Sequence, residues 1–160
     1  MKPINLFYFA LMSSISAFVI RVYGLLLHNN KILLCKEKIK DFEFVKFPGG
    51  GLEFGEGMKD ALHREFLEEL NLEIDIISHI YTTDFFQQSA FKQTDQVISV
   101  YYLVKAKYEN FYINETFISV GNEHILQPFW VDLNNLEVDI VSFPIDQWLI
   151  KNYKNYLLNL

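Results

Sequence analysis

The segment GGLEFGEGMKDALHREFLEELNL, residues 50–72, joins a glycine-rich turn to a run that favours a helix. On a helix with about 100° per residue, its apolar side chains share one face. Glu65 and Glu69 fall inside that face, and Glu68 lies at its edge. The helix therefore turns carboxylates towards the core that its apolar face must meet. The apolar face consists of Met58, Ala61, Leu62, Phe66 and Leu70.

Carboxylates arranged in this way need a positive partner. Like charges four residues apart repel by roughly 0.2–0.5 kcal/mol even on an exposed helix, and carboxylates turned towards a core cost more. Arg64 is the only arginine nearby in the sequence, and one guanidinium cannot neutralise all of them. Clustered carboxylate oxygens are the ligands that Mg²⁺ and Mn²⁺ prefer. The pattern therefore indicates a site for a divalent metal ion.

The same segment resembles the Nudix box, the motif of the MutT-like Nudix hydrolase family. The motif reads Gly, five residues, Glu, seven residues, Arg-Glu, an aliphatic or aromatic residue, any residue, Glu-Glu, any residue, Gly and an aliphatic residue. Eight of the nine fixed positions match, and Asn71 replaces the last glycine. Asparagine is the next-best residue for the left-handed conformation expected there, so we interpret the change as a conservative cap. The matching residues are Gly50, Glu56, Arg64, Glu65, Phe66, Glu68, Glu69 and Leu72.

The resemblance implies a fold and a reaction. The fold is an α/β/α sandwich of the Nudix type, with a mixed β-sheet between helices, and we assign it to residues 18–160. The reaction is a divalent-metal-dependent hydrolysis of a diphosphate bond in a nucleoside diphosphate linked to another group, X. The expected cofactor is Mg²⁺ or Mn²⁺, and the expected partner is a nucleotide or a nucleotide derivative.

The resemblance also gives roles to particular residues. Glu56 would act through a water molecule or orient the metal ligands, and Arg64 would pair with a glutamate of the box and hold it in place. The motif leaves the general base open between Glu65 and a glutamate from a later loop. The expected metal ligands are Glu65, Glu68, Glu69 and the backbone carbonyl of Gly49, which the glycine turn brings close.

Composition indicates one domain, because 160 residues with 51% hydrophobic side chains suit a single core. The acidity is local. Between residues 53 and 73, seven acidic residues stand against Lys59 and Arg64, a charge of −5, while the other 13 acidic and 12 basic residues leave −1. A duplex-binding protein would carry a basic face, and the sequence shows none. Cys35 is the single cysteine, which excludes an internal disulfide.

Residues 1–17 form an N-terminal extension of uncertain status. Its apolar stretch after Lys2 is compatible with a secretory signal, and Met12 is compatible with a later start. The stretch is too short for an ordinary membrane span. Because the resemblance is to enzymes of intracellular nucleotides, we expect a cytoplasmic protein without a membrane anchor.

Patterning elsewhere indicates strands on both sides of the box helix and a final helix with Pro144 at its first position. Residues 36–41 are predicted to be a charged loop, and residues 109–126 a later loop. Strands are expected at 18–27, 31–35, 44–47, 72–81, 97–108 and 129–131, helices at 57–70 and 144–158, and a helical turn at 132–136.

Substrate recognition is expected from aromatic loop residues, because aromatic faces stack on any base. Phe85, Phe86 and Phe91 are the candidates for stacking, and Gln87 and Gln88 could read a base edge.

A second candidate region precedes residue 129. Glu123 stands where relatives supply a further carboxylate, although a solvated loop residue is an equal interpretation, and His124 has the same status. Relatives that cleave ADP-ribose often carry a proline beyond the box. No proline lies between Pro48 and Pro128, so ADP-ribose is a less favoured substrate.

Two alternatives differ in class. A non-catalytic nucleotide-binding module of Nudix type would usually lose box glutamates, whereas this chain keeps Glu56, Glu65, Glu68 and Glu69. An isoprenyl diphosphate isomerase would need a catalytic cysteine, and Cys35 lies in an apolar run. The enzyme is the favoured interpretation, and a homodimer is compatible with the sequence.

Overall fold

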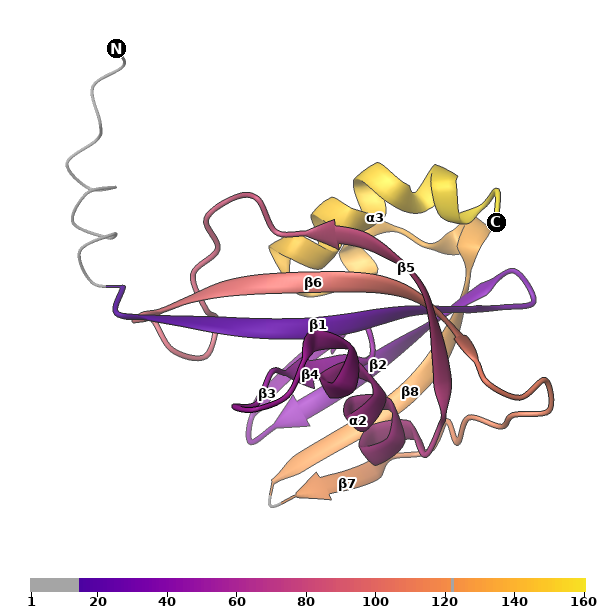
Figure 1. Ribbon diagram of the computed structural model, residues 1–160, viewed down its shortest axis with the longest axis horizontal. Helices are drawn as coiled ribbons and strands as arrows, with labels where there is room; N and C mark the ends of the chain where they lie inside the picture. Colours follow the sequence, from indigo (N-terminus) through magenta and orange to yellow (C-terminus); the bar gives the residue numbers. More distant parts are fainter. Residues whose placement is uncertain (1–14, 122) are drawn as a thin grey trace, which may run out of the picture.

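The computed structural model describes residues 15–121 and 123–160, which build a mixed β-sheet with helices on both faces (Figure 1). The expectation for the N-terminal extension therefore falls almost entirely outside the described residues. The elements are β1 (Ala17–His28), β2 (Lys31–Ile39), β3 (Phe42–Lys46), β4 (Gly49–Gly51), α2 (Met58–Leu70), β5 (Ile74–Thr82), β6 (Asp95–Ala106), β7 (Ile118–Gly121), β8 (His124–Asp132), the short 3₁₀ turns η1 (Leu133–Asn135) and η2 (Val138–Ile140), and α3 (Pro144–Leu157).

Strand β1 organises the sheet. It runs parallel to β6 from the pair Ala17–Asp95 to the pair Leu26–Val104, and antiparallel to β2 and β4. The strand order is β5-β6-β1-β2-β8-β7, with β3 on β2 and β4 on β1. Parallel and antiparallel neighbours occur together, so the sheet is mixed, as predicted.

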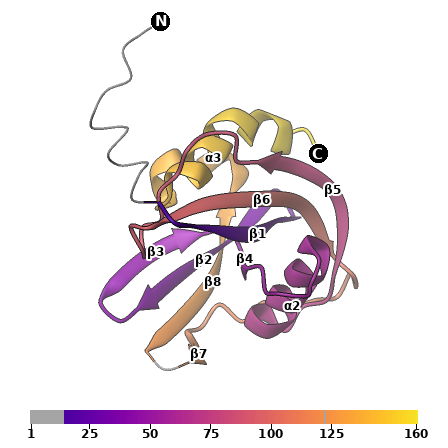
Figure 2. The same ribbon diagram turned by 60° about the vertical axis from the view of Figure 1, so that its left-hand side comes forward.

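The two helices cover opposite faces of this sheet, and the views in Figures 1 and 2 agree on that arrangement. The core under α2 includes Phe66, Leu62 and Val22, while the core under α3 includes Leu149, Leu25 and Tyr101. This arrangement is the predicted α/β/α sandwich. Among the described residues, neither helix combines the length and the apolar character needed to cross a membrane.

Helix α2 has the ends that the sequence predicted. Gly57 precedes it in extended conformation and donates its backbone N–H to Asp60 at 3.2 Å. Asn71 follows it at φ 50° and ψ 40°, and its N–H donates to the carbonyl of Leu67 at 3.0 Å. The left-handed cap predicted for Asn71 is confirmed. The predicted apolar face is buried except for Met58, which is 38% exposed.

The predicted loop at residues 36–41 is wrong, because β2 continues to Ile39. Both edges of β2 are hydrogen-bonded, to β3 and to β8, so its backbone groups are satisfied whatever side chains they carry. The charges follow the two-residue alternation of a strand. Lys36 and Lys38 are exposed, and Glu37 points inward with 3% of its surface exposed.

Two further segments are strands where a turn and a loop were expected. The glycines 49–51 form β4, which pairs with β1 through Val22 and Gly50. The predicted loop at 109–126 contains β7 and the start of β8 at His124. These short pairings depend on neighbours distant in the sequence, so local patterning did not reveal them.

The cap at Asn71 generates a stability prediction. Replacing Asn71 by alanine should lower the free energy of unfolding by about 1 kcal/mol, because a left-handed conformation without a glycine or a short polar side chain costs about 1–2 kcal/mol. Replacement by glycine should change it by less than about 0.5 kcal/mol, because glycine adopts this conformation without strain but gains freedom in the unfolded chain. Urea unfolding measures both variants, and equal losses would contradict the role of the cap.

Candidate active site

A cavity of about 460 Å³ opens between the β1–β6 side of the sheet, the loop after β5 and the first turn of α3. Arg21, Ser99 and Tyr101 come from its strands, and Phe91 comes from its loop. At one end, the cavity wall contains the glycine strand β4 and the carboxylates of Glu65 and Glu69 from α2. The box therefore forms one end of a cavity large enough for a small organic ligand.

The glycine strand determines how close α2 approaches the sheet. Gly49 has φ +131°, and a Cβ there would lie 2.1 Å from the carbonyl oxygen of Val22. A Cβ on Gly50 would lie 2.3 Å from a carboxylate oxygen of Glu65. Gly49 therefore excludes a side chain, whereas a side chain at position 50 would displace the Glu65 carboxylate, which rests directly on the main chain of β4.

Arg64 binds three of the box glutamates at once. Its guanidinium donates to both oxygens of Glu56 at 2.8 and 3.1 Å, to Glu65 at 3.0 Å and to Glu68 at 3.1 Å. It also donates to the carbonyl of Gly51 at 3.1 Å, which ties the helix to β4. These bonds, with Glu56 first, raise the pKa of Arg64. The bond from Arg64 in turn lowers the pKa of Glu56.

Glu69 faces a different cation, Lys46 at the end of β3. The Glu69 side chain is buried, and the Lys46 ammonium lies 3.7 Å from its Oε2. Burial raises the pKa of Glu69 to about 7, although Lys46 opposes this shift. For Lys46, burial would lower the pKa, but the facing carboxylates of Glu69 and Glu37 outweigh it and raise the pKa. Sequence reasoning missed this lysine, whose only signal is a charge inside the apolar run of residues 44–47.

Lys46 and Glu37 belong to a buried polar network. The ammonium of Lys46 lies 2.6 Å from Oε1 of Glu37 and donates to the carbonyl of Gly49. The other oxygen of Glu37, Oε2, lies 2.9 Å from Nε2 of His124. Glu37 and His124 both contribute to the cavity wall. The polar side chain at the start of β8 that reaches the cavity is therefore that of His124, and not that of its neighbour Glu123.

A further buried carboxylate lies in the first turn of α3. Asp146 is 1% exposed, and the hydroxyl of Tyr101 donates to its Oδ1 at 2.6 Å. Within residues 15–121 and 123–160, its Oδ2 accepts no hydrogen bond. Burial raises the pKa of Asp146 to about 7, although Tyr101, Lys46 and Arg21 oppose the shift. Asp146 lines the cavity, and sequence reasoning did not single it out.

The predicted metal ligands lie around the same end of the cavity, but existing cations hold them. Arg64 binds Glu65 and Glu68, and Lys46 binds the Gly49 carbonyl and approaches Glu69. Glu68 is 59% exposed, so it reaches the site from outside. In the described part of the chain, no three His, Cys, Asp or Glu side chains converge as a metal-holding group.

The chemistry of these groups nevertheless fits a hard divalent cation. Every donor is a carboxylate or carbonyl oxygen, which is the set that Mg²⁺ and Mn²⁺ take. Among the described residues, Oε2 of Glu69 is buried and accepts no hydrogen bond. A buried carboxylate oxygen without a hydrogen bond is costly unless a cation approaches it, and here the ammonium of Lys46 does so at 3.7 Å.

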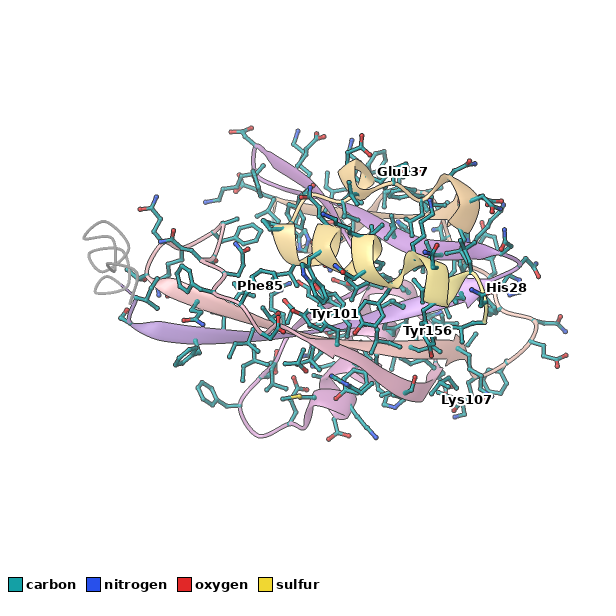
Figure 3. All side chains as sticks on the ribbon, turned by 90° about the horizontal axis from the view of Figure 1, so that it is seen from above. His28, Phe85, Tyr101, Lys107, Glu137 and Tyr156 are labelled. Carbon is teal, nitrogen blue, oxygen red and sulfur yellow. The ribbon has the colours of Figure 1, made fainter. Side chains whose placement is uncertain are left out.

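The residues expected to bind substrate divide into two groups. Phe91, Gln87 and Gln88 line the cavity, while Phe85 and Phe86 are not among the lining residues. Phe85 packs against Trp148 of α3, with ring centroids 6.3 Å apart, and Figure 3 shows it beside that helix. The loop carries several aromatic residues, and only its folded path decides which of them face the cavity.

Glu123 is also outside the cavity wall. It is exposed in the turn between β7 and β8, at φ 60°, and its carbonyl accepts from the backbone of Lys40. The role expected for Glu123 therefore stays a prediction.

A mixed sheet between two helices, with a glycine strand that sets helix carboxylates on a cavity, defines an α/β/α sandwich enzyme of the Nudix type. The family model for the NUDIX domain matches residues 18–151. The chain therefore belongs to the Nudix family, and it is a Nudix hydrolase. No curated protein sequence matches it.

Solved structures show the same fold. The MutT protein from Methanosarcina mazei Go1 has a TM-score of 0.67 at 18% identity, and the match covers 88% of this chain and 96% of that one. A NUDIX hydrolase from Nitrosomonas europaea has a TM-score of 0.66 at 18% identity, covering 86% and 89%. An ADP-ribose pyrophosphatase from Streptococcus suis has a TM-score of 0.55 at 16% identity, covering 88% and 90%. At such identities the likeness concerns the fold.

The proton on Asp146 generates a prediction about pH. Because the folded-state pKa of about 7 lies above the ordinary value of 3.8, the folded protein keeps a proton that the unfolded chain has lost. Stability from this group is present below pH 4 and is lost as the pH rises to about 7. The free energy of unfolding of Asp146→Asn should therefore rise relative to that of the native sequence, and this gap should grow by roughly 2 kcal/mol or more from pH 5 to pH 8. Urea unfolding at both pH values measures the gap, and a gap independent of pH would contradict the raised pKa.

Proposed function

We propose that this enzyme hydrolyses a diphosphate bond in a nucleoside diphosphate linked to another group, X, in a reaction that requires Mg²⁺ or Mn²⁺. The observation that carries the proposal is the position of Glu65 and Glu69 against the glycine strand at the end of a cavity of about 460 Å³. A diphosphate can meet the carboxylate end while the rest of the substrate occupies the cavity.

The metal would be held by oxygen donors that α2 and β4 supply. Glu65, Glu68, Glu69 and the carbonyl of Gly49 are the proposed ligands, and their oxygen chemistry, with Glu65 and Glu69 in the cavity wall, supports this assignment. When bound, a divalent cation supplies charge neutralisation of phosphate oxygens and lowers the pKa of a water molecule.

The remaining chemistry falls to side chains of the box. Arg64 fixes Glu56 and Glu65 through charge-assisted bonds of 2.8–3.1 Å, so their carboxylates hold one orientation while substrate binds. Glu65 lines the cavity with 12% of its side chain exposed, which lets it accept a proton from an attacking water. Glu65 is our proposed general base, and Arg64 and Glu56 position it.

The organic part of the substrate would bind towards α3. Phe91 and Phe143 line that region, with ring centroids 6.1 Å apart, and offer faces on which a base can stack. Asp146 and Gln88 add polar groups in the wall. The Streptococcus suis relative is a pyrophosphatase for ADP-ribose, which supports a nucleotide derivative as the class of substrate. Phe85 would contribute indirectly, by holding Trp148 and α3.

The proposal is tested with a panel of nucleoside diphosphate derivatives and matching monophosphate esters, each with Mg²⁺ or Mn²⁺, in water labelled with ¹⁸O. Substrates with two linked phosphates should be cleaved, and the label should appear on phosphorus because water attacks phosphorus in line. Activity should disappear with EDTA and return with either metal. Full activity in EDTA, or label on carbon of the leaving group, would overturn the proposal.

A single substitution separates the catalytic role of Glu69 from a structural one. Glu69→Gln should reduce turnover at least about 100-fold, as the loss of a metal ligand does, while the metal-free melting temperature stays equal or rises. The physical reason is that it removes a buried charge, while Lys46 keeps Glu37 as its partner at 2.6 Å.

The matched control is Glu73→Gln, which changes an exposed glutamate paired with Lys107 at 2.6 Å outside the cavity. It should leave turnover unchanged. A melting temperature that falls by many degrees in Glu69→Gln, with the control unaffected, would mean that the Glu69 carboxylate serves the fold.

A further inference from the structure

Lys46 is the most deeply buried cation of the carboxylate region, with 1% of its surface exposed. Its ammonium contacts the carbonyl of Gly49, lies 2.6 Å from Glu37 and 3.7 Å from Glu69, and sits 5.7 Å from the centre of the Tyr23 ring. The ring adds a cation–π contact. Two carboxylates, a carbonyl and an aromatic face therefore surround one positive charge.

This set of oxygen donors is also what a hard divalent cation would bind. Two of its members, the Gly49 carbonyl and Glu69, belong to the metal ligands of the proposed function. The ammonium thus occupies a position that would otherwise attract a metal ion. Unlike a metal ion, this ammonium does not exchange, because Lys46 belongs to β3, which pairs with β2, and its side chain is buried.

We propose that Lys46 is a built-in cation that fills the inner cation position, between Glu37, Glu69 and the Gly49 carbonyl. Exchangeable metal is thereby kept to the cavity side, where it would meet Glu65, Glu68 and the acceptor positions of Glu69 and the Gly49 carbonyl that Lys46 leaves free. The inference rests on the proposed function, because it divides the donors of the metal site between a fixed ammonium and a bound divalent ion.

The local charges are consistent with this division. Arg64 serves the outer glutamates, while Lys46 serves Glu37 and Glu69. Arg21 is the further cation near this end, and its Nε donates to the hydroxyl of Tyr23 at 2.6 Å. The carboxylates still outnumber these cations, so the outer position keeps its attraction for a divalent ion. Because the ammonium of Lys46 already compensates the inner carboxylates, a second cation is not required at the inner position.

The test replaces the charge of Lys46 and counts bound metal. Lys46→Met keeps the apolar stem without a charge, and Lys46→Gln keeps a donor for Glu37 without a charge. Mn²⁺ binding to each full-length protein is measured by the EPR signal of free Mn²⁺ during titration. Both variants should bind about one more Mn²⁺ per chain than the native sequence, or bind Mn²⁺ at least about tenfold more tightly, because the freed oxygen donors attract it.

Thermal unfolding supplies a readout that is independent of turnover. Without metal, Lys46→Met should melt roughly 10 °C lower, because two buried carboxylates lose their partner. Mn²⁺ should restore most of this loss and should raise the melting temperature of the native sequence much less. If Lys46→Met does not fold without metal, Lys46→Gln carries the comparison, because its amide still hydrogen-bonds the carboxylate.

Two matched variants isolate the inner position. Lys36→Met removes an exposed lysine paired with Glu43 at 3.0 Å on the neighbouring strand, and should keep the native Mn²⁺ count. Lys46→Met combined with Glu37→Gln removes one buried charge of each sign, and should lose the additional Mn²⁺ site.

The outcomes separate the two proposals. An unchanged Mn²⁺ count and an unchanged metal-induced shift in melting temperature, in folded Lys46 variants of a protein that binds Mn²⁺, would overturn the built-in cation and leave the proposed function intact. If neither the native sequence nor the variants bind Mn²⁺, the metal dependence itself fails, and the inference fails with it.

Discussion

The close approach of a side-chain-free strand to a helix that carries carboxylates is the constraint on which the site depends. A Cβ at Gly49 would meet the backbone of β1, and a Cβ at Gly50 would displace the carboxylate of Glu65 on α2. The helix therefore brings Glu65 against main chain, and Glu69 is buried behind it. Such an arrangement concentrates negative charge in a place with little water, which is costly unless cations are provided.

Two cations of different character, Arg64 and Lys46, compensate this charge. Arg64 spreads its planar fork over the outer glutamates and remains partly exposed, with 24% of its side chain accessible. Lys46 places a compact charge among the buried oxygens. The first cation orders the ligands, and the second compensates the interior. Because Lys46 opposes the effect of burial, the pKa of Glu69 is raised less than burial alone would raise it.

The other helix completes the cavity. The start of α3 brings Phe143 and Asp146 to the cavity wall, and the loop after β5 adds Phe91. The box carboxylates and these residues therefore come from different elements, and α2 and α3 lie on opposite faces of one sheet.

The sequence by itself determined the box helix and its left-handed cap at Asn71, while the resemblance of the box implied the α/β/α fold and the pairing of Arg64 with a box glutamate. The helix and its cap follow from spacing within one segment, where each residue's neighbours are known from the helix itself. Only the tertiary structure decided that β2 continues through Glu37, that Lys46 and Asp146 are buried beside the cavity, and that Phe91 lines it while Phe85 packs on α3. The physical reason is that burial and pairing of these residues depend on strands and helices distant in the chain, whose register no local pattern records.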